Sequence, residues 1–121
     1  PLDLYDKIKK ALTFQGVKYI HIHTPCPPGW GFEPRYAVKV GKLAVETGLY
    51  ELYEIEKSRL RHTGASLKLM EKRRLLPVKD YLRAQSRFKT MPDAEMEKIQ
   101  DLVTRKWEGY SESFDEAEGG E

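Results

Sequence analysis

The segment Pro25-Cys26-Pro27-Pro28-Gly29-Trp30-Gly31 constrains the fold of this chain more than any other. It holds the only cysteine of the 121 residues, three of the seven prolines and one of the two tryptophans. Each proline fixes φ and lacks a backbone donor, which excludes a helix here and disfavours a central strand. Cys26 precedes a proline and is biased toward extended backbone. We therefore expect a stiff loop, turned tightly by its glycines, that presents one thiol.

The residues before this loop predict a helix followed by a strand. Leucine and isoleucine recur at helical spacing between residues 4 and 12, and Gly16 ends that helix. Residues 17–23 are rich in β-branched and aromatic side chains, which predicts a strand. A helix, a glycine and such a strand form half of a parallel α/β unit, yet the chain offers no parallel neighbour for the strand. The sequence is therefore expected to be a fragment or one piece of a larger assembly.

The residues after the loop predict a second helix and a short hairpin. Apolar residues at helical spacing indicate a helix from Pro34 to Thr47, closed by Gly48. Residues 49–56 alternate in character, and a turn at Lys57-Ser58 would lead into a second short strand at 59–62. Such a two-stranded ribbon is marginal alone and should lie against something larger.

The last part of the chain predicts helices that cover a neighbouring surface. Pro77 can begin a short helix, and Thr90 with Asp93 resembles a capping box at the start of a longer one. We expect residues 57–107 to lie across another subunit. The expected apolar contacts are Leu75, Leu76, Met96, Ile99, Val103 and Trp107.

Charge is distributed unevenly although the net charge is only +2. Residues 57–89 hold eleven Lys or Arg and two acidic residues, a local net charge of +9. Residues 111–121 hold five acidic residues and no basic one, which predicts a disordered tail. The basic stretch would suit nucleic acid, an acidic protein or another subunit of a complex.

The residues alone allow several roles for the Cys26 thiol. A free cysteine is most often a small buried hydrophobe, and one cysteine cannot form a disulfide within the chain. His21, His23 and Cys26 could bind zinc, although two histidines on a packed strand more often only hydrogen-bond. An iron–sulfur cluster would need ligands from outside this sequence. We find no catalytic triad and no Gly-rich phosphate loop.

The segment His21 to Gly31, with its Pro-Cys-Pro-Pro-Gly-Trp core, resembles the C-terminal part of the β subunit of pyruvate:ferredoxin oxidoreductase and related 2-oxoacid oxidoreductases. Leu-Ala-Val-Glu-Thr-Gly at 43–48 and Leu-Tyr-Glu at 52–54 follow in the same order. Residues 77–88 are similar to the C-terminal arm of the same family. The resemblance spans roughly residues 1–105.

This resemblance implies that Cys26 is the last of four thiolates around a [4Fe-4S] cluster beside thiamine diphosphate. The other three, and the Gly-Asp-Gly segment that holds the diphosphate and its Mg²⁺, would lie upstream of this sequence. The implied reaction is the oxidative decarboxylation of a 2-oxoacid, by default pyruvate, with coenzyme A and with ferredoxin as electron acceptor. The implied site residue of this chain is Cys26 as a metal ligand, with no catalytic residue.

The expected fold class is α/β. Residues 1–56 would be the last helix–strand–loop–helix–strand portion of a thiamine diphosphate-binding parallel α/β domain. Residues 57–110 would form a basic, extended and partly helical C-terminal arm, and residues 111–121 an acidic disordered tail. The arm would contact other subunits or dock an acidic ferredoxin.

The alternative is a basic module without catalysis that binds nucleic acid or protein. Tyr81 and Phe88 lie among its arginines. No recognised nucleic-acid motif accompanies them, and the proline-framed cysteine would be left unexplained, so we expect no nucleic-acid partner. We also expect no membrane partner, because no apolar run approaches the ~20 residues that span a bilayer. A single cysteine suits a reducing cytoplasm.

Overall fold

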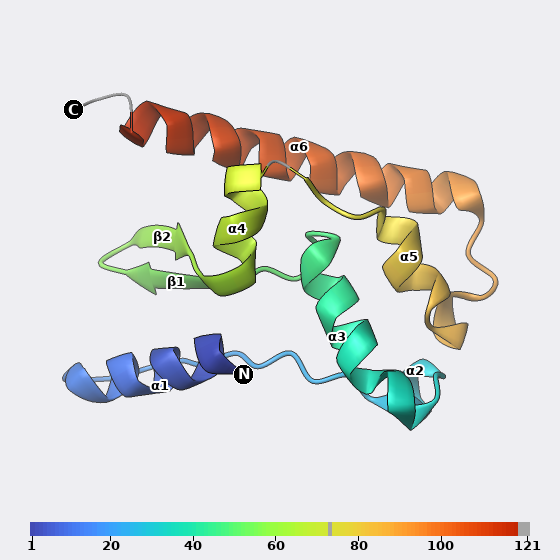
Figure 1. The fold of residues 1–121 in the computed structure, drawn as a ribbon, viewed down its shortest axis with the longest axis horizontal. Coiled ribbons are helices and arrows are strands. Elements are labelled where there is room, and N and C mark those ends of the chain that lie inside the picture. Colours follow the sequence, from blue (N-terminus) through green and yellow to red (C-terminus); the bar gives the residue numbers. More distant parts are fainter. Residues whose placement is uncertain (73, 119–121) are drawn as a thin grey trace.

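A computed structural model of the chain describes residues 1–72 and 74–118. The elements in chain order are α1 (Leu2–Thr13), α2 (Pro27–Trp30), the 3₁₀ turn η1 (Pro34–Tyr36), α3 (Ala37–Glu46), β1 (Tyr53–Glu56), β2 (Arg59–His62), α4 (Gly64–Lys72), α5 (Val78–Arg83), the 3₁₀ turn η2 (Ser86–Phe88) and α6 (Asp93–Glu118). Figure 1 shows α6 along one side of the molecule, with α4, α3 and α5 beneath it and α1 on the opposite side. The described chain is thus mainly helical with a small two-stranded sheet.

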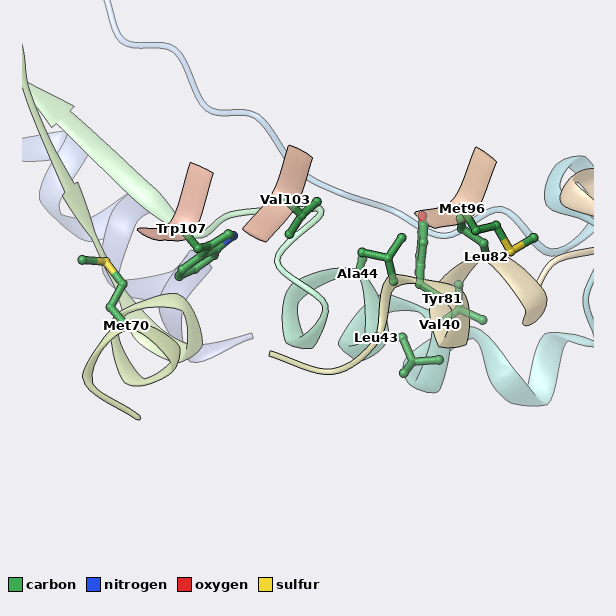
Figure 2. Close-up of a cluster of buried hydrophobic side chains, with 10 residues drawn as sticks. Val40, Leu43, Ala44, Met70, Tyr81, Leu82, Met96, Val103 and Trp107 are labelled. Atoms are coloured by element: carbon green, nitrogen blue, oxygen red, sulfur yellow. The ribbon is translucent and has the colours of Figure 1, made fainter. Parts of the chain in front are cut away.

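The hydrophobic core lies where α3, α4, α5 and α6 meet (Figure 2). Its buried members are Val40, Leu43, Ala44, Met70, Val78, Tyr81, Leu82, Met96, Val103 and Trp107. The apolar residues of α6 recur every three or four positions, so they form one stripe that packs onto the shorter helices. The expectation that Met96, Val103 and Trp107 contact another subunit is wrong, because the chain buries them in its own core.

Helix α3 confirms the helix that the sequence predicted after the loop. Val40 and Ala44 are each only 1% exposed and face the core. Gly41 lies against the ring of Pro25, since a Cβ at Gly41 would lie 3.3 Å from the proline Cγ. The helix ends before Gly48, whose φ of +75° suits a residue without Cβ. Small residues on α3 therefore let the proline-rich loop approach closely.

The hairpin confirms the predicted turn and second strand. β1 and β2 are antiparallel, with Glu56 opposite Arg59 in register. Lys57 and Ser58 both have positive φ, as in the two-residue turns that match strand twist. The first strand begins at Tyr53 rather than at residue 49. Residues 49–52 instead turn around the end of α3, where the backbone N–H of Tyr50 donates to Ala44.

The strand predicted at residues 17–23 is absent. These residues form an irregular connection that runs back past α1 toward α2 (Figure 1). A strand needs a partner for its backbone hydrogen bonds, and within the described residues β1 and β2 pair only with each other. The side chains of Val17 and Tyr19 are almost fully exposed. The described residues therefore hold no parallel strand pair.

Helix α1 confirms the first predicted helix, but none of its residues is buried. It contacts the hairpin through Lys10, whose ammonium lies 2.6 Å from Glu54 and 3.2 Å from Glu56. Leu2 and Leu12 are 80% and 78% exposed, so part of its apolar surface has no cover in this chain. No helix in the described ranges combines the length and apolar character needed to cross a membrane.

Helix α6 differs from prediction at its N-terminal end. It begins at Asp93, so Thr90 lies too early to be its N-cap, and the Asp93 carboxylate instead accepts hydrogen bonds from Lys79 and Arg83. Its backbone is helical through Glu118, whereas the disorder expected for residues 111–121 stays a prediction. Residues 111–118 contain no Gly or Pro to end a helix. Residues 119–121 lie outside the described part.

Candidate functional site

Cys26 stands immediately before the single-turn helix α2 and is exposed, with φ −112° and ψ 96°. The extended backbone at Cys26 was predicted, but the expectation that the prolines exclude a helix is wrong for the next four residues. Pro27 and Pro28 occupy the first two helical positions, where a backbone N–H would have no partner within the helix. The N–H of Trp30 donates to the Cys26 carbonyl at 2.9 Å. Cys26 is therefore the first residue of a rigid turn.

The two glycines of the turn have separate roles. A Cβ at Gly29 would lie 3.2 Å from the Cys26 Sγ, so this glycine leaves space beside the sulfur. Gly31 has a φ of +71°, which is the left-handed conformation that ends the turn. Its carbonyl accepts the backbone N–H of Ser86 at 2.9 Å, and a Cβ at Gly31 would collide with the Ser86 hydroxyl. The tight turn expected from these glycines is confirmed.

Aromatic rings and one guanidinium surround the turn. The Trp30 ring centroid lies 5.5 Å from that of His23, and the guanidinium carbon of Arg87 lies 4.2 Å from the Trp30 centroid. His23 also stacks on Tyr50, with 4.5 Å between the ring centroids. Trp30 is half-buried, as is common for a large aromatic side chain that packs against a loop. Trp30 thus packs against both the His23 ring and the Arg87 guanidinium.

The two histidines beside the loop do not form a metal site with the thiol. His21 lies edge-on to Tyr50, and the Tyr50 hydroxyl donates to the His21 carbonyl at 3.2 Å. Burial lowers the pKa of His23, and the charges of His21 and Arg87 add to this effect. The described residues contain no group of three His, Cys, Asp or Glu positioned to hold a metal ion. The zinc alternative therefore has no geometric support.

A single exposed thiol on a stiff turn could supply one ligand to an iron–sulfur cluster. The sequence holds one cysteine, so a [4Fe-4S] cluster bound by four thiolates would need the other three from outside it. The open side of Cys26 and the space left by Gly29 are compatible with that arrangement.

The sequence did not predict a buried charged cluster that joins the hairpin to α6. Glu51 accepts a hydrogen bond from His62 Nε2 at 2.9 Å and pairs with Lys106. Burial opposes ionisation of Glu51, but the hydrogen bonds from His62 and Lys106 outweigh it, so the pKa of Glu51 is lowered. The His62 ring also packs on Trp107 and Tyr110. No local pattern signals this cluster, because its members are far apart in the sequence.

Several basic side chains of residues 57–89 contact groups of the same chain. Lys79 and Arg83 both pair with Asp93, and Arg61 pairs with Glu54. Arg87 stacks on Trp30 instead. These contacts reduce the charge available to a nucleic acid. The basic-module alternative therefore loses part of its support.

No protein-family model matches the chain, whereas a comparison with curated proteins finds similar subunits of pyruvate synthase and of ketoisovalerate oxidoreductase. The chain is 40% identical over 106 residues to the pyruvate synthase subunit PorB of Methanocaldococcus jannaschii, which is 88% of this chain and 34% of that subunit. It is 35% identical over 113 residues to the subunit PorB of Thermotoga maritima, covering 89% of this chain and 33% of the relative. The ketoisovalerate oxidoreductase subunit VorB of Pyrococcus furiosus is 32% identical over 108 residues, again 89% of this chain and 33% of the relative. The chain thus spans about a third of the length of the curated relatives it matches.

Proposed function

Since this chain is homologous to PorB, the β subunit of pyruvate:ferredoxin oxidoreductase, we propose that it forms part of a 2-oxoacid:ferredoxin oxidoreductase acting on pyruvate. In this proposal Cys26 supplies one of four thiolates to a [4Fe-4S] cluster. The observation that carries it is the exposed thiol at the start of a rigid turn, with Gly29 leaving space beside the sulfur. The relatives named for pyruvate and for ketoisovalerate support a 2-oxoacid as substrate.

Several residues of the loop would contribute to cluster binding. The Cys26 thiolate would hold one iron, while Pro25 against Gly41 and the short helix α2 would restrict movement of the ligand. The proline-rich loop would limit water and motion near the cluster, two of the factors that set its reduction potential. When bound, such a cluster supplies one-electron transfer.

The remaining groups of the reaction would be bound mainly by residues outside this sequence. These are the other three cysteines, thiamine diphosphate and Mg²⁺. Coenzyme A, the 2-oxoacid, ferredoxin and the other subunits of the complex are the proposed partners. The uncovered side chains of α1 and residues 17–23 support the placement of residues 1–56 in a larger thiamine diphosphate-binding domain.

The proposal is tested with Cys26→Ser in the assembled enzyme. Serine is a poorer iron ligand than thiolate, so we expect loss or destabilisation of one cluster and slower electron delivery to ferredoxin. Thiamine diphosphate binding should change less, since its ligands lie elsewhere. The measurements are iron per complex, the electron paramagnetic resonance spectrum of the reduced enzyme, and ferredoxin reduction. Thr24→Ser, two residues away, is the matched control.

Alkylation provides a second test. A thiolate bound to iron is shielded, so Cys26 should react with iodoacetamide only after iron is removed. Full iron content and unchanged ferredoxin reduction in Cys26→Ser would contradict the ligand role and leave Cys26 as an ordinary surface thiol.

A further inference from the structure

Residues of η2 contact the turn that carries Cys26. The Ser86 N–H donates to the Gly31 carbonyl at 2.9 Å, and the Arg87 guanidinium lies over the Trp30 ring at 4.2 Å. The same guanidinium lies 4.6 Å from the Phe88 ring centroid. Two adjacent residues of η2 therefore contact two adjacent residues of the loop, one through a backbone hydrogen bond and one through a cation–π contact.

The orientation of Arg87 is set by a buried amide. Arg87 Nε donates to Gln85 Oε1 at 2.9 Å, and Gln85 Nε2 donates to the Tyr81 carbonyl at 2.8 Å. Gln85 is 1% exposed and follows α5, whose side chains belong to the core. Among the ion pairs within residues 1–72 and 74–110, none neutralises Arg87. The core of α5 thus positions a cation on the face of Trp30.

Trp30 transmits this support to the thiol-bearing residue. Its backbone N–H donates to the Cys26 carbonyl at 2.9 Å, so Trp30 and Cys26 are the two ends of one turn. A cluster ligand must be held close to its productive geometry, and groups that orient it contribute to that precision. A guanidinium suits the task better than an ammonium, because it is planar and can stack while donating a hydrogen bond in its plane.

We propose that Arg87 is a positioning residue for the cluster ligand: stacked on Trp30 and oriented by Gln85, it holds the turn that directs the Cys26 thiol toward the metal. This inference rests on the proposed function for the identity of the bound group. The contacts between η2 and the loop do not depend on it.

The test uses Arg87→Gln in the assembled enzyme with the full-length subunit. In the iron-depleted complex, hydrogen exchange at the amides of Trp30 and Gly31 should accelerate about tenfold, because the stack that supports the turn is lost. In the iron-loaded complex, a chelator should remove iron from the affected cluster several times faster. Arg83→Gln removes the same charge from the same stretch without touching Trp30, and should leave both rates within about twofold of wild type.

Arg87→Lys distinguishes stacking from charge. It keeps the cation but loses the planar contact and the Gln85 hydrogen bond, so exchange at Trp30 should stay closer to that of Arg87→Gln than to wild type. Unchanged exchange at Trp30 and Gly31 in Arg87→Gln overturns the proposal, as does faster exchange without faster iron loss. Cys26→Ser reports separately on the proposed function, because retained iron there would remove the ligand role while the exchange data still decide whether Arg87 holds the turn.

Discussion

The indole Nε1–H of Trp107 donates a hydrogen bond to the carbonyl of Gly48 at 3.1 Å, and so joins α6 to the end of α3. Trp107 is 5% exposed, and Gly48 has a φ of +75°. A Cβ at Gly48 would collide with the indole ring. This contact holds α6 against Gly48, just after the end of α3.

Gly48→Ala should lower the free energy of unfolding of the intact subunit by about 2 kcal/mol or more, since positive φ strains a residue with Cβ and the new methyl meets Trp107. Gly109→Ala is the matched control, because no atom of residues 1–72 or 74–110 lies within 4 Å of its added Cβ. In the interior of α6 it should stabilise by about 0.5–1 kcal/mol. Denaturant unfolding measures both, and equal effects would contradict the contact.

Glu51→Gln should cost about 1–3 kcal/mol at neutral pH, because His62 and Lys106 lose a buried ionised partner. The folded-state pKa of Glu51 is lowered from 4.5. Its contribution is therefore complete above the unfolded value and is lost as the pH falls through the lower folded value. The free energy of unfolding, measured between pH 3 and 7, should fall with decreasing pH in wild type, and this fall should be smaller in Glu51→Gln. Glu108→Gln, an exposed change on α6, should alter stability by less than about 0.5 kcal/mol.

His23→Phe should remove a pH dependence from the Cys26 loop. The folded-state pKa of His23 is lowered from 6.5 by burial, so the unfolded loop binds the proton first, and local stability falls as the pH drops from about 6.5 toward the folded value. His23 Nε2 has no hydrogen-bond partner among the described residues, so phenylalanine loses little. Hydrogen exchange of residues 22–26 between pH 5 and 7, corrected for the intrinsic rate, measures the effect. The same dependence in wild type and His23→Phe would rule this out, and Lys18→Gln, an exposed change in the same segment, is the control that should retain it.

Residues 1–121 expressed alone should aggregate or bind a hydrophobic dye. Val17 is 104% exposed, Tyr19 87% and Leu12 78%, and the relatives are about three times as long, so we expect the missing cover in the remainder of such a subunit. Removing residues 1–23 should reduce dye binding, because the core of α3–α6 stays intact. Monomeric, cooperative unfolding of residues 1–121 by sedimentation and calorimetry would contradict this expectation.

Local patterns predicted several elements well. The helices α1 and α3, the Lys57-Ser58 turn and the strand at Arg59–His62 follow from apolar spacing, glycine ends and turn chemistry. Each of these depends on residues within a few positions of one another. Short-range propensity is enough to specify them.

The wrong expectations have separate physical causes. Residues 17–23 have strand composition but no partner in this chain, and strand structure depends on that partner. Pro27 and Pro28 were expected to prevent a helix, yet they occupy the two positions where proline is tolerated. Asp93 was expected to cap a helix with Thr90, but nearby Lys79 and Arg83 attract its carboxylate.

By itself the sequence determined that Cys26 begins a stiff turn, because prolines fix φ and glycines admit the conformations that close it. Only the tertiary structure decided that Arg87 lies on Trp30, that Glu51 is buried between His62 and Lys106, and that Trp107 reaches Gly48. These contacts join residues far apart in the chain. They exist because α5 and α6 pack their apolar stripes onto α3, and that packing is a property of the assembled helices rather than of any local segment.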